Sequence, residues 1–239
     1  MKIEVLADSD SVALAAAAFI AGEAATGVRA RGRFVLAVSG GRTPRRTLSA
    51  LAREALPWQG VHIVQVDERV APMGHDDRNL TDLRASLLER VPLRGEQIHT
   101  MPVDSPDLHA AAAGYARQLS EIAGSPPIID LAQLGLGVDG HTASLVPGDP
   151  VLDVTDADVA VTGVYESRRR MTLTYPILNR ARCILWIVTG SQKADALSRL
   201  HAGDRSIPAG RVNRPHALIL ADCSAAAQRA PAAVKEVQP

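Results

Sequence analysis

Short apolar runs alternate with longer segments of helical periodicity along this chain. Several of the runs are almost continuous in Val, Ile and Leu, which is typical of strands covered on both faces. The runs expected to form strands are Ile3–Leu6, Phe34–Val38, Val61–Val66, Ile128–Leu136, Val159–Thr162, Met171–Leu173, Cys183–Val188 and Ala217–Leu220. Helices are expected at residues 11–30, 44–55, 79–90, 106–123 and 191–201. The alternation predicts an α/β fold with a mostly parallel sheet.

The same pattern predicts a single domain. The chain has 239 residues, which fits one large or two small domains at about 150 residues each. It contains no long Pro-, Gly- or Ser-rich run that could act as a linker, and no internal repeat. We therefore expect residues 1–223 to form one α/β domain. Residues 224–239 are rich in Ala, Pro and Gln, and we expect a flexible tail there.

Charge and cysteine content narrow the class of protein. Lys and Arg total 26 and Asp and Glu total 26, so the formal net charge is zero. This balance argues against an electrostatic role on nucleic acid or on an anionic membrane. The two cysteines, Cys183 and Cys223, are too few for a disulfide framework or a four-cysteine zinc site. A reduced, cytoplasmic protein is expected, as a monomer or a weak dimer.

An apolar run near the N-terminus resembles a signal peptide only superficially. The run Val12–Ala21 follows the acidic residues Glu4, Asp8 and Asp10, where a signal peptide carries positive charge. Ten apolar residues are also too few to cross a bilayer. We expect neither a signal peptide nor a membrane-spanning segment.

In open parallel sheets, ligands bind beyond the carboxyl ends of the strands, and three segments at such ends carry polar residues. The first, Ser39–Pro44, reads SGGRTP between a strand and a helix. Thr43 is expected to cap that helix and Pro44 to be its first residue. Glycines and a helix N-terminus favour a bound anion. The segment therefore predicts a phosphate site, or else an ordinary capped turn; the binding candidates are Ser39, Gly40, Gly41, Arg42 and Thr43.

The second segment is Asp67-Glu68-Arg69, directly after the strand Val61–Val66. Asp67 and Arg69 are two residues apart, so in an extended chain they would share a side and could pair. A solvated salt bridge in a loop is the alternative interpretation.

The third segment, Gly135–Gly148, contains three glycines around Asp139 and His141. Its glycines satisfy the pattern G-x-G-x-x-G, but a carboxylate at Asp139 would repel a pyrophosphate, so dinucleotide binding is rejected. His141 is a candidate general base that Asp139 could orient, and a structural histidine is the alternative. No His-x-x-x-His or Cys/His cluster indicates a metal site, and the serine hydrolase motif G-x-S-x-G is absent.

Two further basic segments are candidates for anion binding. Lys193 lies where a strand ends and a helix opens, in the sequence TGSQK. The run Arg168–Arg170 precedes a short strand and could supply a phosphate contact or a solvated surface. Which of its three arginines would meet a phosphate stays open.

Together, these segments resemble the 6-phosphogluconolactonase family. The resemblance covers roughly residues 30–200 and is most specific in the pattern L-G-x-G-x-D-G-H-T-A-S-L-x-P-G. It implies a modified Rossmann-like α/β domain with helices on both faces, shared with glucosamine-6-phosphate deaminases. It also implies hydrolysis of 6-phospho-D-glucono-1,5-lactone to 6-phospho-D-gluconate, in the oxidative pentose phosphate pathway, without a cofactor or metal.

The resemblance also assigns residues. His141 matches the family's general base with Asp139 in its loop, and Asp67 and Arg69 match a polar pair lining the lactone site. The remaining matches are phosphate-site positions: Ser39, Gly40, Gly41, Thr43, Lys193 and Arg170. This chain departs from the family at Arg42, often a serine, and at Arg78-Asn79, where many members read Ser-Asn.

Two other functions stay in view. Deaminases or isomerases of the same fold typically carry a glutamate five residues after the histidine, and this chain has Val146 there. A non-catalytic sugar-phosphate sensor would need no general base, so the presence of His141, Asp67 and Arg69 disfavours it.

Overall fold

The computed structural model describes residues 1–213 and 215–227. Most of the tail expected at residues 224–239 therefore lies outside the described residues. Seven strands form one sheet in the order β1 (Lys2–Leu6), β10 (Ala217–Asp222), β9 (Cys183–Val188), β6 (Leu131–Leu134), β2 (Phe34–Val38), β3 (Val61–Gln65) and β5 (Ile98–His99). Every neighbouring pair in it is parallel. The expected α/β fold with a parallel sheet is confirmed.

The strand order reverses in the middle of the sheet. From β2 the chain proceeds outward to β3 and β5, whereas from β6 it proceeds the other way to β9 and β10. The two central strands pair directly, with Leu36 opposite Leu131. A crevice forms at such a reversal, beyond the carboxyl ends of the strands.

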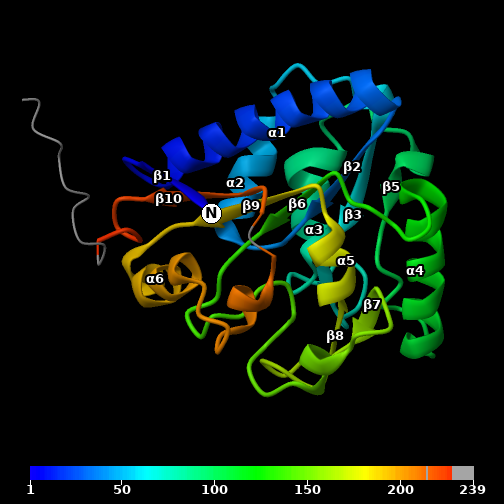
Figure 1. Cartoon of the computed structure of the whole chain (residues 1–239). Helices are drawn as coiled ribbons and strands as arrows, with labels where there is room; N and C mark the ends of the chain where they lie inside the picture. The colour runs from blue at the N-terminus through cyan, green and yellow to red at the C-terminus, as the bar shows by residue number, and fades with distance from the viewer. Residues whose placement is uncertain (214, 228–239) are drawn as a thin grey trace, which may run out of the picture.

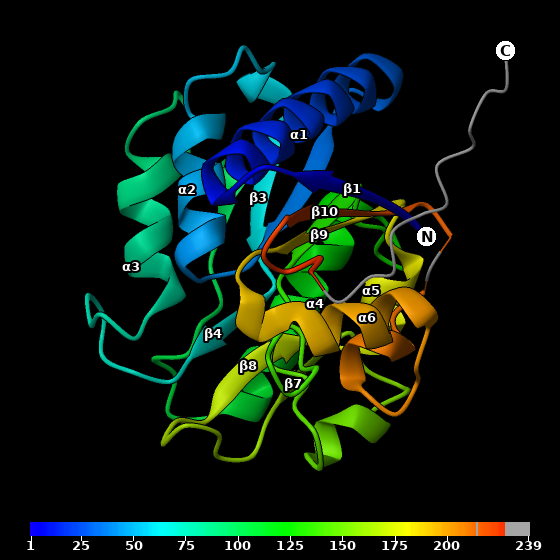
Figure 2. The same ribbon diagram turned by 90° about the vertical axis from the view of Figure 1, so that its left-hand side faces the viewer.

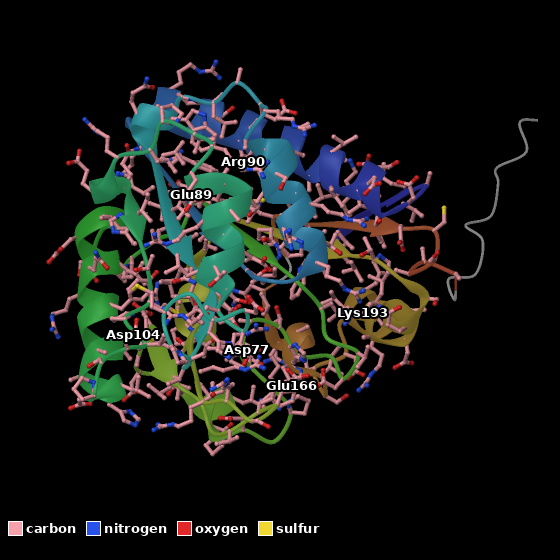
Figure 3. The ribbon with its side chains drawn as sticks, turned by 180° about the vertical axis from the view of Figure 1, so that it is seen from behind. Asp77, Glu89, Arg90, Asp104, Glu166 and Lys193 are labelled. Carbon is pink, nitrogen blue, oxygen red and sulfur yellow. The ribbon has the colours of Figure 1, made fainter. Side chains whose placement is uncertain are left out.

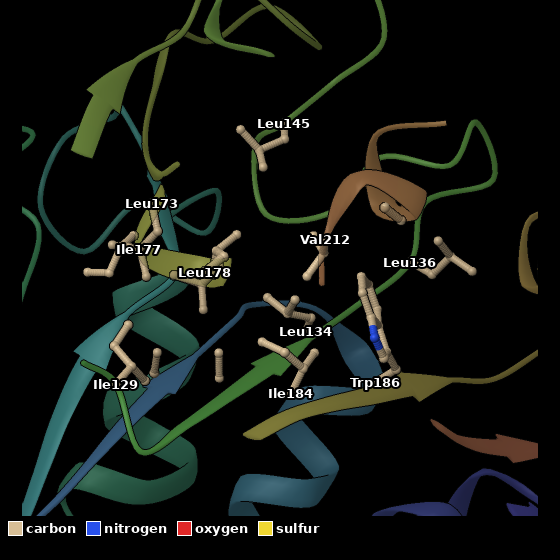
Figure 4. Close-up of a cluster of buried hydrophobic side chains, with 14 of the residues drawn as sticks. Ile129, Leu134, Leu136, Leu145, Leu173, Ile177, Leu178, Ile184, Trp186 and Val212 are labelled. Carbon is tan, nitrogen blue, oxygen red and sulfur yellow. The ribbon is translucent and has the colours of Figure 1, made fainter. Parts of the chain in front are cut away.

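Helices cover both faces of this sheet, as Figures 1 and 2 show. Helices α1 (Ser9–Arg31), α2 (Arg42–Leu51) and α3 (Asn79–Leu83) pack on one face, and α4 (Leu108–Ala123), α5 (Tyr175–Arg180) and α6 (Ala194–Ala202) on the other. Side chains alternate along a strand, so Phe34 and Leu36 face the first group while Val35 and Ala37 face the second. Figure 4 shows part of the hydrophobic core between the sheet and the second group of helices, around Trp186.

A small antiparallel sheet lies beside the carboxyl ends of the main strands. It consists of β4 (Asp67–Arg69), β8 (Arg170–Leu173) and β7 (Val159–Val161). Asp67 stands opposite Thr172, and Arg69 opposite Arg170. β4 starts one residue after β3 ends, so the chain passes from one sheet to the other at Val66. The expectation that Asp67–Arg69 forms a loop is therefore wrong.

Several boundaries also differ from expectation. Helix α2 begins at Arg42 with Gly41 as its N-cap, at a φ of 116°, so Thr43 is not the cap and Pro44 is not the first residue. The strand expected over Ile128–Leu136 is shorter, as β6. The helix expected over 79–90 is α3 followed by a π-helical turn, Arg84–Leu88. The short elements α5 and β5 were not expected.

Helix α1, expected over residues 11–30, extends beyond the ten-residue apolar run Val12–Ala21 on both sides. It spans 23 residues and is long and apolar enough to match a membrane span by length and composition. A buried core helix passes the same test, and one side of α1 packs in the core, where Val12, Ala16 and Ile20 are fully buried. The match in length and composition is by itself weak evidence for a membrane-spanning helix.

Candidate active site

A polar cleft of about 590 Å³ lies at the carboxyl ends of β2, β3, β6 and β9. Every residue that the sequence analysis assigned to a site lines it, except Asp139, which lies against His141. The predicted residues lining the cleft are Ser39, Gly40, Gly41, Arg42, Thr43, Asp67, Arg69, His141, Arg170 and Lys193. Segments far apart in sequence therefore meet at the point where the strand order reverses.

The turn after β2 presents Ser39 to the cleft in a fixed orientation. The Ser39 backbone N–H donates to Gln133 Oε1 (3.2 Å), and Gln133 Nε2 donates to Ser39 Oγ (2.9 Å). Because Ser39 Oγ accepts from Gln133, its own hydroxyl proton is available for a ligand. Gly40 lies against Asn79, where an added Cβ would come within 1.9 Å of Asn79 Oδ1. A larger residue at position 40 would therefore displace the Asn79 side chain that contacts Asp67.

A second turn, Thr189–Lys193 after β9, lies beside the turn Ser39–Thr43 in the cleft. Thr43 Oγ1 and Thr189 Oγ1 are hydrogen-bonded at 2.7 Å. Both carboxylate oxygens of Asp222 accept from the Gly190 N–H, at 3.0 and 3.1 Å. Lys193 closes the turn at the N-terminus of α6, and Figure 3 labels it there. Burial lowers the pKa of Lys193, and repulsion from Arg42 adds to the effect while Asp139 opposes it.

Asp67 is held by two polar side chains that sequence reasoning missed. Ser144 Oγ donates to Asp67 Oδ2 (2.6 Å) and Asn79 Nδ2 donates to Asp67 Oδ1 (3.2 Å). Among the described residues no ion pair joins Asp67 to Arg69, so the pairing that their spacing would allow does not form here. Arg69 instead donates to the backbone oxygen of Asp77 (2.8 Å).

Glu68, between them, is a structural residue. It is fully buried, and its two carboxylate oxygens accept the backbone N–H groups of Asn79 (2.8 Å) and Leu80 (2.9 Å) at the start of α3. It also pairs with Arg78, at 3.3 Å. Arg78 thus serves this buried pair and does not line the cleft, whereas its neighbour Asn79 does.

Of the three consecutive arginines, Arg170 reaches the cleft. Its side chain is 4% exposed and bonds Glu166 at 2.8 Å. The Nε atoms of Arg69 and Arg170 are both buried without a hydrogen-bond partner among the described residues. Arg168 instead pairs with Asp77, at 2.9 Å, and Arg169 does not line the cleft. Two arginines from paired positions of β4 and β8 that both line the cleft suit an anionic or strongly polar ligand.

His141 and Asp139 form a close pair in the loop after β6. His141 Nδ1 lies 2.6 Å from Asp139 Oδ1, which also accepts the His141 backbone N–H at 3.2 Å. Burial works against ionisation of Asp139, but the attraction and hydrogen bonds of His141 outweigh it and lower the pKa of the carboxyl. An ionised Asp139 assigns the proton to Nδ1, which leaves the Nε2 lone pair of a neutral imidazole for proton abstraction.

Gly137 makes this pair possible. A Cβ at residue 137 would come within 2.1 Å of His141 Nδ1 and 2.5 Å of Asp139 Oδ1. The glycine pattern of this loop therefore serves close packing of the pair. Val146, five residues after His141, is 4% exposed and lies outside the cleft lining.

The described residues contain no group of three or more His, Cys, Asp or Glu side chains that could hold a metal ion. What the cleft offers is a histidine–carboxylate pair, a buried carboxylate held by neutral donors, and several cations. This set can bind an anionic ligand and move a proton beside it.

Comparison with known proteins gives a consistent result. The chain matches the family described as glucosamine-6-phosphate isomerases/6-phosphogluconolactonase over residues 7–220. It is 40% identical over 176 residues to the 6-phosphogluconolactonase of Synechocystis sp., covering 72% of this chain and 73% of that protein. It is 37% identical over 241 residues to the 6-phosphogluconolactonase of Mycobacterium tuberculosis, covering 95% and 98%. The crystal structure of 6-phosphogluconolactonase from Thermotoga maritima matches with a TM-score of 0.82 and 25% identity, over 92% of this chain and 98% of that one.

Proposed function

Since this chain belongs to the glucosamine-6-phosphate isomerase/6-phosphogluconolactonase family, we propose that it hydrolyses 6-phospho-D-glucono-1,5-lactone to 6-phospho-D-gluconate. The reaction belongs to the oxidative pentose phosphate pathway. The relatives quoted above carry the name of this activity. The observation that carries the proposal is the 2.6 Å pair of His141 and Asp139 inside a cleft lined by cationic side chains.

The phosphate is proposed to dock on the turn after β2. There the Ser39 hydroxyl and the N–H groups at the start of α2 are donors, and Lys193 and Arg42 supply charge. No carboxylate pairs with Lys193 or Arg42 among the described ion pairs. A dianionic group would therefore meet cations that are not already neutralised by a bonded partner.

His141 is proposed to act as general base and then as general acid. Its Nε2 takes a proton from water, and the hydroxide attacks the lactone carbonyl carbon. Arg69 or backbone N–H groups of the loop stabilise the oxyanion of the tetrahedral intermediate. When that intermediate collapses, the bond between the carbonyl carbon and the ring oxygen breaks, and His141 returns its proton to the ring oxygen. Asp139 stabilises the imidazolium between the two steps.

Asp67 is proposed to orient the substrate. Its oxygens accept one hydrogen bond each from the side chains of Ser144 and Asn79, and each oxygen has a second lone pair for a further donor. A sugar hydroxyl that donates to Asp67 would fix the ring relative to His141.

A deaminase or isomerase is the alternative within the same family. The resemblance to those enzymes implies a glutamate at the position of Val146, which is buried here and has no proton to exchange. Val146 therefore favours the lactonase.

We also propose that this enzyme works in the cytoplasm without nucleic-acid or membrane partners, because its formal charge is zero and its two cysteines are free. A monomeric or weakly dimeric state stays a prediction.

The deciding experiment measures opening of 6-phosphogluconolactone generated in situ, with wild type and His141→Ala. We expect the variant to lose about 10²–10⁴-fold in kcat, the usual contribution of general-base catalysis. It should still bind 6-phosphogluconate, because the phosphate cradle is untouched.

The matched control is His109→Gln, since His109 is exposed and outside the cleft. Glucosamine 6-phosphate is assayed in parallel. Near wild-type turnover by His141→Ala would contradict the general-base role. Release of ammonia from glucosamine 6-phosphate without lactone opening would favour the deaminase. Inactivity on both substrates would favour the non-catalytic sugar-phosphate sensor.

A further inference from the structure

A tight hairpin between β7 and β8 places one aromatic residue against the proposed catalytic pair. Tyr165 and Arg168 face each other across a two-residue turn, where each backbone N–H donates to the other's oxygen (2.9 and 3.1 Å). The two turn residues, Glu166 and Ser167, have φ of 47° and 65°. Such turns normally carry Asn or Gly, because other side chains resist the left-handed conformation.

Tyr165 contacts three residues of the proposed site at once. Its hydroxyl donates to Asp139 Oδ2 at 3.3 Å. Its ring meets the His141 ring edge-on, with centroids 5.6 Å apart and planes at 68°. The Arg170 guanidinium carbon lies 4.8 Å from the centroid of the same ring. A single side chain therefore links the proposed base, its carboxylate partner and a cation of the cleft.

The hydroxyl contact has a specific consequence for Asp139. Oδ1 of Asp139 is occupied by His141, through both the ring nitrogen and the backbone N–H. Among the described residues, Oδ2 accepts a hydrogen bond only from Tyr165. Without that hydroxyl, the Asp139 carboxylate could rotate about its Cβ–Cγ bond, which would weaken its hydrogen bond with His141 Nδ1.

We propose that Tyr165 is a positioning residue with two separable parts: its hydroxyl fixes the Asp139 carboxylate, and its ring supports Arg170 in the cleft. The inference rests on the proposed function for its effect on turnover. The hydroxyl acts through the histidine and should influence the chemical step. The ring acts through Arg170, which lines the cleft and matches a phosphate-site position of the family, so it should influence substrate binding.

The ionisation state of the phenol is suited to this role. Burial raises the pKa of Tyr165, and the nearby charges of Asp139 and Glu166 raise it further, although Arg170 opposes them. The phenol therefore stays protonated and remains a donor to the carboxylate at neutral and mildly alkaline pH.

The left-handed turn supports the same interpretation. Two non-glycine residues in this conformation are unfavourable, so the turn depends on surrounding contacts to hold it. One such contact is the bond from Glu166 to Arg170, at 2.8 Å. The turn thereby holds the adjacent Tyr165 and Arg170 in one fixed arrangement.

Two variants separate the two parts in the lactone-opening assay. Tyr165→Phe removes the hydroxyl and keeps the ring, so we expect kcat to fall about threefold to tenfold, the effect of one hydrogen bond, with KM unchanged. Tyr165→Ala removes both, and we expect KM to rise by about threefold or more in addition, because Arg170 loses its aromatic contact. Val164→Ala, a change in the same hairpin at an exposed residue, is the control and should match wild type.

A spectroscopic measurement tests the hydroxyl without turnover. Nitrogen NMR of the histidine rings, assigned with His141→Gln, reports which ring nitrogen of neutral His141 carries the proton. We expect the Nδ1–H form in wild type and a mixture with the Nε2–H form in Tyr165→Phe.

Each outcome has a distinct meaning. Wild-type kcat together with an unchanged His141 tautomer in Tyr165→Phe would overturn the positioning role. A change confined to KM in that variant would also overturn it, because the hydroxyl would then act on binding. If wild type itself fails to open the lactone, the proposed function is wrong, and the NMR comparison still decides whether Tyr165 fixes the pair.

Discussion

Two of the pairs that histidines form in this structure have opposite characters, one with a carboxylate and one with a second imidazole. At the carboxyl ends of the strands, His141 is half-buried beside the carboxylate of Asp139. Further from the cleft, His62 of β3 and His99 of β5 stack with ring centroids 5.4 Å apart, and His62 Nδ1 lies 3.1 Å from His99 Nε2. His99 is 5% exposed, and burial lowers its pKa to about 4, with the charge of His62 adding to the effect.

The comparison shows that the chemical character of the neighbouring group decides which roles an imidazole can take. The Asp139 carboxylate lies against His141 Nδ1 and can orient the ring. The His62 imidazole brings no negative charge to His99, and burial penalises the charged form of His99. Burial also lowers the pKa of His62, with Arg33 adding to the effect and Glu96 opposing it. The first pair is the one proposed to exchange protons during the reaction, whereas in the second pair burial disfavours the charged form of both imidazoles.

The largest test of this comparison is Asp139→Asn. The amide removes the negative charge and can donate to Nδ1, which would favour the tautomer with the proton on Nε2 and block the base. We expect kcat to fall by about 10²–10⁴-fold, comparable to loss of the base itself. Asp156→Asn, at an exposed aspartate outside the cleft, is the control for the lactone assay. A loss below about threefold, the scale of one weak hydrogen bond, would show that His141 works without its carboxylate.

The second test concerns the stability of the His62–His99 pair in acid. Folded His99 takes up a proton only near pH 4, whereas an unfolded histidine does so near 6.5. The unfolded chain therefore binds more protons between these values, and stability falls as the pH drops through this window. Urea unfolding at about pH 7 and about pH 5 should show that wild type loses about 1–2 kcal/mol more than His99→Leu.

His109→Gln controls for loss of an exposed histidine in the same measurement. Identical pH dependence in wild type and His99→Leu would mean that the second pair is not the neutral element described above.

The smallest expected effect concerns the left-handed turn Glu166-Ser167 between β7 and β8, beside the cleft. Ser167→Gly relieves a left-handed residue but makes the unfolded chain more flexible, and these contributions partly cancel. We expect the free energy of unfolding to rise by about 0.5 kcal/mol, measured from the urea midpoint. A clear loss of stability would mean that the Ser167 side chain makes a contact that outweighs its strain. Cys223→Ser, at an exposed cysteine away from the turn, provides a neutral reference.

Much of the fold was predictable because strands covered on both faces leave runs of Val, Ile and Leu in the sequence. β4 gave no such signal, since it consists of Asp67, Glu68 and Arg69. It is a strand because β8 pairs with it and because the start of α3 satisfies the buried Glu68. Both causes depend on distant segments, which local propensity does not contain.

The candidate site divides in the same way. The glycine-rich turns placed Ser39, His141 and Lys193 correctly in one cleft, because strand ends in a parallel sheet converge. The pairing that the spacing of Asp67 and Arg69 allows does not form, because each has another partner across the fold, such as Ser144 for Asp67. Tyr165 was missed, since its contact with Asp139 exists only when the hairpin and the loop have folded together.

The pairing of β1 with β10 has a consequence for protein synthesis. Of the described strands, β1 is translated before all the others, yet its neighbour in the sheet is β10, the last of them to be translated. β1 therefore has no strand partner while the central strands are being made. This edge of the sheet can form only after residues 217–222 have been translated, so its assembly follows that of the central strands.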